Sequence, residues 1–323
     1  MNVLYILGNG FDMAQGMKTS YPEFYKYLMK NTDNGSPLLQ QLKKDINANK
    51  LLWSDMEEAF GQFTSKVRTA SDLENLYFEL SDNLQKYLEA EEKAFNPSDK
   101  LRNKFVGDFF HPERYLGETD KIAYNSFVKK IGASHDISVM SFNYTDSFEK
   151  LLSLGPATDK KIDSNNYFRQ IVHVHGRLKD SIIIGVDNVE QIANEQFRNN
   201  EDVTDFLIKI QSNVAMKYTR HSTCDNLILN AHLIILYGVS LGNTDARWWK
   251  LIGEQFKKRN TLCIIQYLYK PNDIPPTRKQ LLGRIERTQQ QWLMKKFGIR
   301  NEEWPEDTTD RLFFITNSNA FKI

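Results

Sequence analysis

Four short segments of the chain combine glycine with polar side chains that could bind and cleave a small molecule. They are Gly8-Asn9-Gly10-Phe11-Asp12, Ser141-Phe142-Asn143-Tyr144-Thr145-Asp146, His173-Val174-His175-Gly176 and Gly238-Val239-Ser240-Leu241-Gly242-Asn243-Thr244-Asp245. An imidazole with an ordinary pKa near 6.5 accepts a proton at neutral pH. An Asn amide holds a water with its carbonyl oxygen and a hydroxyl with its N–H groups. These residue types indicate acid–base chemistry on a polar ligand.

Each segment lies at the end of an apolar run that is typical of a buried parallel strand. The runs cover residues 3–7, 137–140, 171–174 and 233–237, and further runs cover 182–184, 262–268 and 312–315. Helical stretches such as 201–216 and 244–257 separate most of them. Strands that alternate with helices predict an α/β fold with a Rossmann-like, mostly parallel sheet. Ligands of such sheets bind beyond the carboxyl ends of the strands.

A long helical region follows the opening unit. Its best helix carries an apolar stripe with acidic residues opposite. The stripe consists of Leu73, Leu76, Leu80, Leu84, Tyr87 and Leu88. We therefore expect a single α/β domain over residues 1–323 with a helical insertion over approximately 36–131.

The opening turn predicts a nucleotide site. A Gly-x-Gly turn after a strand lets a phosphate or ribose lie against main-chain N–H groups. The dehydrogenase fingerprint does not fit, because Met13 occupies the place of its third small residue and Gly16 comes too late. Residues 21–29 read as a helix where that fingerprint needs a second strand ending in an acidic residue.

Composition and net charge argue against membrane-spanning, secreted and nucleic-acid-binding proteins. The chain has 323 residues, of which 41% are hydrophobic, and no segment approaches the roughly 18 apolar residues of a membrane span. The N-terminus leads directly into an apolar run, so we expect no signal or transit peptide. A net charge of +1 offers no global field for nucleic acid. Cys224 and Cys263 suit a reducing compartment, so we expect a cytoplasmic protein without a membrane or clear nucleic-acid partner.

Two further motifs have competing interpretations. His173 and His175 form a His-x-His pair, but two ligands do not make a metal site, so we expect no metal. Residues 238–242 match the nucleophile elbow of esterases, with Ser240 as the nucleophile. That fold needs its histidine after the serine, whereas the last histidine is His232. The order disfavours an esterase.

Two polar segments have a plain structural interpretation as helix caps. Ser54 and Glu57 are spaced as a capping box at the start of a helix. Asn143 could cap a helix that begins near Thr145.

Together with Gly16, Thr19, Tyr21, Phe24 and Trp53-Ser54-Asp55-Met56-Glu57, the four segments resemble the AbiH family of bacterial phage abortive-infection proteins. That family in turn resembles the sirtuin-like NAD-binding proteins, which implies a sheet of the sirtuin-like type and NAD as substrate or ligand. The resemblance implies that Asn143 and His175 are catalytic at the nicotinamide ribose. It implies cofactor binding by Gly8, Asn9, Gly10, Asp12, Gly176, Gly238, Ser240 and Asp245, with Glu57, Thr19, Tyr144 and His173 as further possible contacts.

The resemblance therefore implies an anti-phage effector that hydrolyses NAD and releases nicotinamide. With two cysteines the chain cannot build the four-cysteine zinc module of sirtuin deacylases, which disfavours deacylation. Two alternatives remain open: a non-catalytic module that senses NAD or another nucleotide, and an interaction protein whose site has decayed. A phage-derived trigger and a homo-oligomer are further expectations.

Overall fold

The computed structural model describes residues 1–31, 35–153, 160–268, 276–316 and 318–322. Its centre is a sheet in the order β3-β4-β2-β1-β5-β6-β7. Six strands run parallel: β1 (Asn2–Leu7), β2 (His135–Ser141), β4 (Asn166–His173), β5 (Leu233–Tyr237), β6 (Cys263–Tyr267) and β7 (Leu312–Ile315). The two-residue β3 (Lys160–Lys161) pairs antiparallel with β4. The predicted Rossmann-like α/β fold is confirmed.

Helices cover both faces of this sheet. Val3, Tyr5 and Leu7 pack into one apolar core with α6 (Asp99–Phe110), α7 (Glu118–Ile131) and α8 (Ser147–Leu152). Leu4 and Ile6 face the opposite core, which is formed with α12 (Arg220–Asn230), α13 (Ala246–Lys258) and α14 (Leu282–Lys296). The alternation along β1 follows from the two-residue period of a strand. A strand buried on both faces carries the continuous apolar run seen in the sequence.

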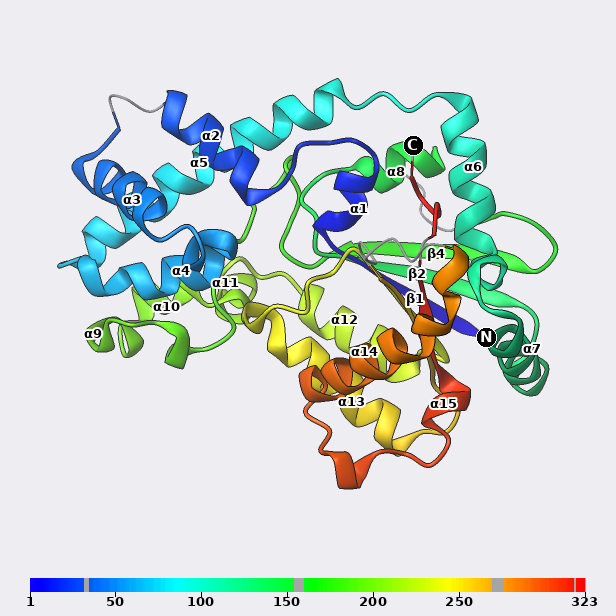
Figure 1. Cartoon of the computed structure of the whole chain (residues 1–323). Helices are drawn as coiled ribbons and strands as arrows, with labels where there is room; N and C mark the ends of the chain where they lie inside the picture. Colours follow the sequence, from blue (N-terminus) through cyan, green and yellow to red (C-terminus); the bar gives the residue numbers. More distant parts are fainter. Residues whose placement is uncertain (32–34, 154–159, 269–275, 317, 323) are drawn as a thin grey trace.

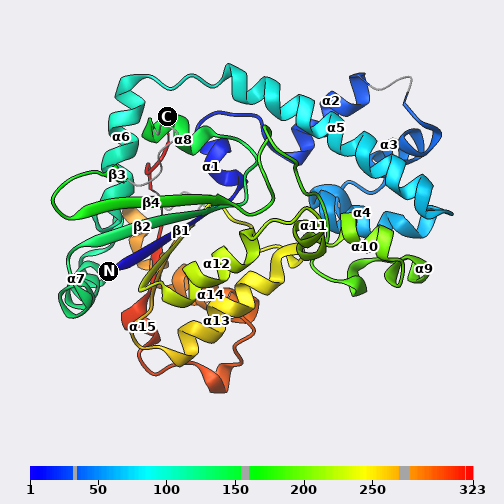
Figure 2. The ribbon, with the colours of Figure 1, turned by 180° about the vertical axis from the view of Figure 1, so that it is seen from behind.

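A third core lies beside the sheet. Figures 1 and 2 show its helices gathered on the side toward which β1 runs, next to α1 (Asn9–Ala14). They are α2 (Tyr21–Asn31), α3 (Pro37–Ala48), α4 (Met56–Phe63), α5 (Ala70–Ala94), α9 (Glu195–Arg198), α10 (Glu201–Leu207) and α11 (Lys209–Ala215). The predicted leucine stripe of α5 is buried there. This helical layer faces the carboxyl ends of the strands, where the predicted site residues lie.

Two predicted elements are wrong. Residues 182–184 do not form a strand: they are buried without regular secondary structure, and Ile182 and Ile184 pack into the helical layer. Residues 201–216 do not form one helix, because the chain breaks at Ile208 between α10 and α11. Ile208 is extended and forms an isolated parallel bridge with Val186. An apolar run signals burial, and it does not say whether its partner is a sheet or helices.

Candidate functional site

A cleft of about 630 Å³ opens where the carboxyl ends of the strands meet the helical layer. Clefts of this size hold cofactors and other small molecules. Most of the predicted site residues line it. They are Gly8, Asn9, Gly10, Asp12, Thr19, Glu57, Asn143, Tyr144, His175, Gly238, Ser240 and Asp245. The structure thus gathers residues from five separate parts of the chain into one cavity.

The glycines of the opening turn serve close packing between two strand ends. A Cβ on Gly10 would lie 2.6 Å from Cα of Gly238, and one on Gly8 would lie 2.6 Å from the Gly238 carbonyl oxygen. The N–H groups of Gly8, Gly10 and Phe11 donate to the carbonyls of Tyr237, Gly238 and Gly8. These three amides are therefore already occupied within the protein. The prediction that this turn binds a nucleotide is not tested by these bonds and stays a prediction.

Asp12 is a buried acceptor that joins the ends of β1 and β2. Its carboxylate accepts from Asn143 Nδ2 at 3.0 Å, Thr145 Oγ1 at 2.6 Å and Ser147 Oγ at 2.5 Å. Burial raises the pKa of Asp12 to about 6, and the hydrogen bonds from Ser147, Thr145 and Asn143 oppose that rise. Asp12 is 1% exposed, so it acts mainly on Asn143 and the turn after β2.

This contact fixes the Asn143 amide. A carboxylate accepts only, so the side that faces Asp12 must be the NH₂ group. The carbonyl oxygen Oδ1 then has no hydrogen-bond partner among the described residues, and the side chain lines the cleft. Asn143 is not the cap of the following helix, because α8 begins at Ser147, its N-cap residue is Asp146, and no side chain caps it.

Other predicted residues shape the cleft wall. Asn9 donates to the Thr19 carbonyl at 2.9 Å, and the Thr19 hydroxyl donates back to the Asn9 side chain. Tyr144 donates to the carbonyl of Ile183 at 2.9 Å. These bonds tie the opening turn and the β2 turn to neighbouring loops.

His175 lies just beyond β4 and is paired with Asp245. Its Nε2 is 3.0 Å from Asp245 Oδ1, and the imidazole is 4% exposed. The other ring nitrogen, Nδ1, is buried and has no partner among the described residues. Burial, with Lys209 nearby, lowers the pKa of His175 below its ordinary value. A neutral imidazole that donates from Nε2 to Asp245 carries its lone pair on Nδ1.

A buried lysine holds two carboxylates together behind the histidine. Lys209 Nζ lies 2.7 Å from Glu57 Oε2 and 3.0 Å from Asp245 Oδ2, and it also donates to the Thr244 carbonyl at 3.1 Å. Burial would lower the pKa of Lys209, but Asp245 and Glu57 raise it. Burial would raise the pKa of Asp245, but Lys209 and His175 hold it below its ordinary value. Glu57 and Asp245 line the cleft, and Lys209 holds both of them from behind.

The predicted capping box at Ser54 and Glu57 is wrong. Asp55 is the N-cap of α4, and its carboxylate accepts from the N–H groups of Glu57 and Glu58 at 3.1 Å each. The Glu57 side chain turns inward to Lys209 instead of back to the cap. Burial raises the pKa of Glu57, and Lys209 opposes that rise.

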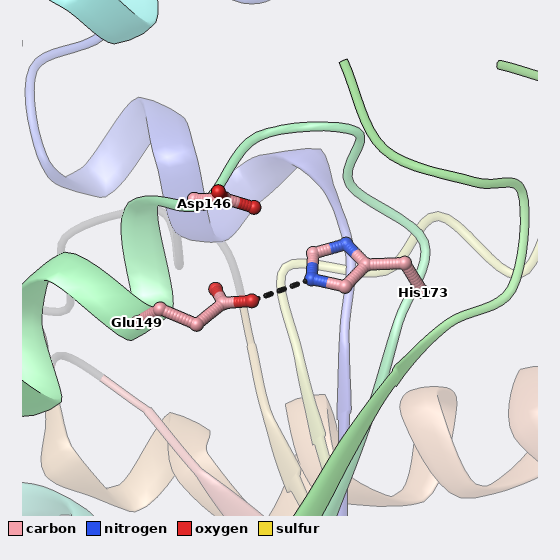
Figure 3. Close-up of side chains that lie close together, drawn as sticks. All are labelled: Asp146, Glu149 and His173. Atoms are coloured by element: carbon pink, nitrogen blue, oxygen red, sulfur yellow. Dashed lines mark hydrogen bonds and ion pairs between the residues drawn. The ribbon is translucent and has the colours of Figure 1, made fainter. Parts of the chain in front are cut away.

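His173 belongs to a second cluster. Its Nδ1 is 2.7 Å from the Asn143 carbonyl, and its Nε2 is 2.9 Å from Glu149 Oε1. Figure 3 shows Glu149 reaching the ring from α8, with Asp146 beside them. One atom from each of Asp146, Glu149 and His173 lies within 4.8 Å of the others, a spacing that could hold a metal ion. His173 is not among the residues that line the cleft.

Two basic side chains already occupy this cluster. Arg177 Nε and Lys179 Nζ bind Asp146 at 2.7 and 2.8 Å, and Arg177 also lies 3.5 Å from Glu149. Burial would raise the pKa of Asp146, but the hydrogen bonds from Lys179 and Arg177 hold it below its ordinary value. A metal ion would have to displace both cations. The expectation that His173 binds no metal therefore stays a prediction.

Gly176 and Ser240 differ in their surroundings. Gly176 has a φ of 85°, and a Cβ there would lie 2.0 Å from the Ser181 carbonyl oxygen. It serves the turn after His175 and is not among the residues that line the cleft. Ser240 is exposed on the cleft wall, and no described histidine is bonded to it.

Sequence reasoning missed Lys209. The break at Ile208 places Lys209 at the start of α11, where its main-chain N–H donates to the Val186 carbonyl at 3.1 Å. The available signal was a lysine between the apolar residues Ile208 and Ile210. A lysine is almost never buried unless it is paired.

Among the described residues, the structure contains no helix that is both long enough and apolar enough to cross a membrane. A family model described as "Bacteriophage abortive infection AbiH" matches residues 4–267. That range includes every residue of the cleft except Lys296. No curated protein matches the chain.

Proposed function

The chain belongs to the AbiH family of bacteriophage abortive-infection proteins, and from this premise we propose that it binds NAD in the cleft and hydrolyses it, releasing nicotinamide in the cytoplasm of an infected cell. Loss of NAD would then stop the growth of that cell. A phage-derived signal would start the reaction.

One observation carries the proposal: an Asn and a His with unused hydrogen-bonding atoms line the same cleft. The amide of Asn143 is fixed by Asp12, and no hydrogen bond to its Oδ1 is found among the described residues. In the same part of the chain, the buried Nδ1 of His175 has no partner. Buried polar atoms without partners are rare in folded proteins. A bound water would satisfy Oδ1 of Asn143. A ribose hydroxyl that displaces the atoms covering Nδ1 of His175 would satisfy that nitrogen.

The balanced reaction needs only these groups and water. The bond between ribose C1′ and the nicotinamide nitrogen breaks, and nicotinamide leaves neutral with the electron pair. Water, which Asn143 orients, adds to C1′. His175 takes the proton of a ribose hydroxyl as the bond breaks, that hydroxyl regains a proton from the attacking water, and His175 returns its proton to solvent. The products are ADP-ribose, nicotinamide and one proton.

The charge of the cleft supports a substrate that is cationic at the reacting end. Asp12, Asp55, Glu57, Glu58 and Asp245 line it, whereas Lys296 is its one lysine or arginine among the described residues. The nicotinamide ring of NAD is cationic, and the ribose gains positive charge as the bond breaks. Carboxylates fixed before the reaction stabilise such developing charge.

The test is release of nicotinamide from NAD by the purified protein, measured by chromatography, and loss of NAD in infected cells. Asn143→Ala and His175→Ala should each lower turnover by on the order of 10²-fold or more with little change in NAD affinity. His111→Ala is the matched control, because His111 lies outside the cleft and pairs with Glu113.

Two results would overturn hydrolysis. One is growth arrest while cellular NAD is unchanged; the other is NAD loss that neither substitution affects. If the protein binds NAD and the cells arrest without NAD loss, the nucleotide-sensing module replaces the enzyme.

A further inference from the structure

We infer that Asp245 and Lys209 are positioning residues that make Nδ1 of His175 the proton acceptor of the cleft. The inference rests on the proposed hydrolysis and adds to it the atom that accepts the proton and the residues that prepare it.

The first step concerns the tautomer. An ionised carboxylate accepts and never donates, so Asp245 Oδ1 at 3.0 Å from Nε2 requires the proton to be on Nε2. The neutral ring then has its lone pair on Nδ1, which is buried without a partner among the described residues. The phenyl ring of Phe142 contacts the imidazole edge to face, with centroids 5.2 Å apart, and restricts its rotation.

The second step concerns how Asp245 is held. Its Oδ1 binds His175, and its Oδ2 binds Lys209 at 3.0 Å. Lys209 is in turn fixed by Glu57 and by the Thr244 carbonyl. Both oxygens of Asp245 are therefore directed by fixed partners, which leaves the carboxylate one orientation.

Glu57 is fixed in the same way. It accepts from the Thr244 hydroxyl at 3.1 Å and from the Gly185 N–H at 3.4 Å. Burial raises the pKa of Glu57 to about 7, and Lys209 opposes that rise and favours the ionised form. The ion pair thus ties α4 and α11 of the helical layer to the loop after β5.

The third step concerns the net charge of the buried group formed by Glu57, Lys209 and Asp245. With Glu57 and Asp245 ionised, two negative charges face one ammonium, so the buried group has one negative charge in excess. A proton that arrives on His175 cancels that excess. A group arranged before the reaction lowers the barrier because it does not need to reorganise when the charge appears. Lys209 also keeps His175 neutral before substrate binds. Without Lys209, two carboxylates that lack a cation would hold a proton on His175.

The first experiment observes the tautomer directly. Nitrogen NMR of histidine-labelled protein distinguishes the protonated ring nitrogen from the unprotonated one, and His175→Gln assigns the His175 signals among the six histidines. We expect neutral His175 with the proton on Nε2 at pH 7. In Asp245→Asn, the amide NH₂ can donate to Nε2, so the proton should move to Nδ1. Glu149→Gln is the matched control, because it changes the acidic partner of His173 and should leave the His175 signals in place.

The second experiment measures turnover. Asp245→Asn should lower nicotinamide release by on the order of 10²-fold or more while NAD affinity changes little. Glu57→Gln combined with Lys209→Met keeps the net charge of the buried group and leaves Asp245 bonded to His175, so it should fold. This double variant should also lower turnover, because Asp245 loses its contact with Lys209 and keeps only the one with His175.

The outcomes separate this inference from the proposed function. Wild-type protein that releases nicotinamide while His175 has its proton on Nδ1, or while Asp245→Asn retains full turnover, would overturn the inference and leave hydrolysis standing. Wild-type protein that releases no nicotinamide in an activated state would overturn both. Three results together would establish that Asp245 positions His175: the expected tautomer, its switch in Asp245→Asn, and the loss of turnover in that variant.

Discussion

The amide of Asn143 donates to the carboxylate of Asp12 at 3.0 Å, across the ends of two adjacent parallel strands. The contact is buried, and it decides which end of the amide faces the cleft. Asp12, which the sequence analysis names as a cofactor-binding residue, therefore acts mainly by orienting Asn143. The consequence can be tested by changing the charge of either partner.

Asn143→Asp should place a second carboxylate against Asp12 and destabilise the fold in a pH-dependent way. The folded pKa of Asp12 is raised from 3.8 to about 6, so its contribution to stability is greatest at low pH and falls as the pH rises through 6. A second acid strengthens this trend, and we expect a loss of about 3 kcal/mol at pH 8. At pH 5 the pair shares a proton and the loss should be smaller.

Thermal unfolding at pH 5 and pH 8 measures this difference. Asn143→Ala is the uncharged control, and its loss of stability should be similar at both values. An equal loss for Asn143→Asp at both pH values would show that Asp12 and Asn143 are not coupled in this way.

The acid limb of the pH–rate profile should report His175. Burial and Lys209 lower its pKa, so the base stays unprotonated to a pH below 6.5, and turnover should fall only below that value. The charged and titratable groups around the ring are Asp245, Lys209, Arg220 and His221.

Glu57→Gln with Lys209→Met removes the nearest cation and should move the midpoint of that acid limb to higher pH, by roughly 1 unit. The profile of kcat/KM between pH 4.5 and 8 measures the midpoint. A midpoint that stays in place, or moves to lower pH, would show that Lys209 does not act on His175.

Gly10→Val should prevent folding, and it is therefore not a test of ligand binding. Its Cβ would lie 2.6 Å from Cα of Gly238, a distance that backbone cannot accommodate without a shift of β1 against β5. The yield of soluble protein and its thermal unfolding measure this. A folded Gly10→Val variant with wild-type stability would contradict the close approach of the two turns.

Ser240→Tyr is the better test of the cleft. Ser240 is exposed on the cleft wall, so a tyrosine ring can occupy space that a nucleotide needs without disturbing the core. We expect NAD affinity to fall by at least about 10-fold with unchanged thermal stability. Ser126→Tyr, at an exposed position on α7, is the matched control. Calorimetric titration with equal affinity in all three proteins would place the ligand elsewhere.

Dialysis against a strong chelator should leave thermal stability and turnover unchanged. Arg177 and Lys179 already neutralise Asp146 beside His173 and Glu149, so a metal ion gains little there. Elemental analysis of the purified protein measures bound metal. Stoichiometric zinc or manganese, lost together with activity on dialysis, would make the His173 cluster a metal site.

The parallel sheet could be predicted because its strands are continuous apolar runs that end in polar or glycine-rich segments. β1, β2 and β5 follow from the sequence because burial on both faces leaves few polar positions inside the strand, such as Ser138 in β2. The run 182–184 has the same composition but lies under helices. Composition reports burial and does not identify the burying partner.

The cleft was predictable in outline because parallel strands bring their carboxyl ends to one edge. Asn143 and His175 reach it from β2 and β4, as the strand pattern indicates. Lys209 was not predictable, because its place depends on a helix break at Ile208 and on packing between segments far apart in the sequence. The role of Gly10 was also hidden, since a close approach to another backbone leaves the same signature as a close approach to a phosphate.

The buried group around Lys209 also sets how much of the chain must be made before the wall of the cleft is complete. Glu57, His175, Lys209 and Asp245 come from positions far apart in the chain, and Asp245 is the last of them to leave the ribosome. A nascent chain, or a fragment released before residue 245, lacks the partner that sets the tautomer of His175. The buried group is therefore complete only after residue 245 has been made.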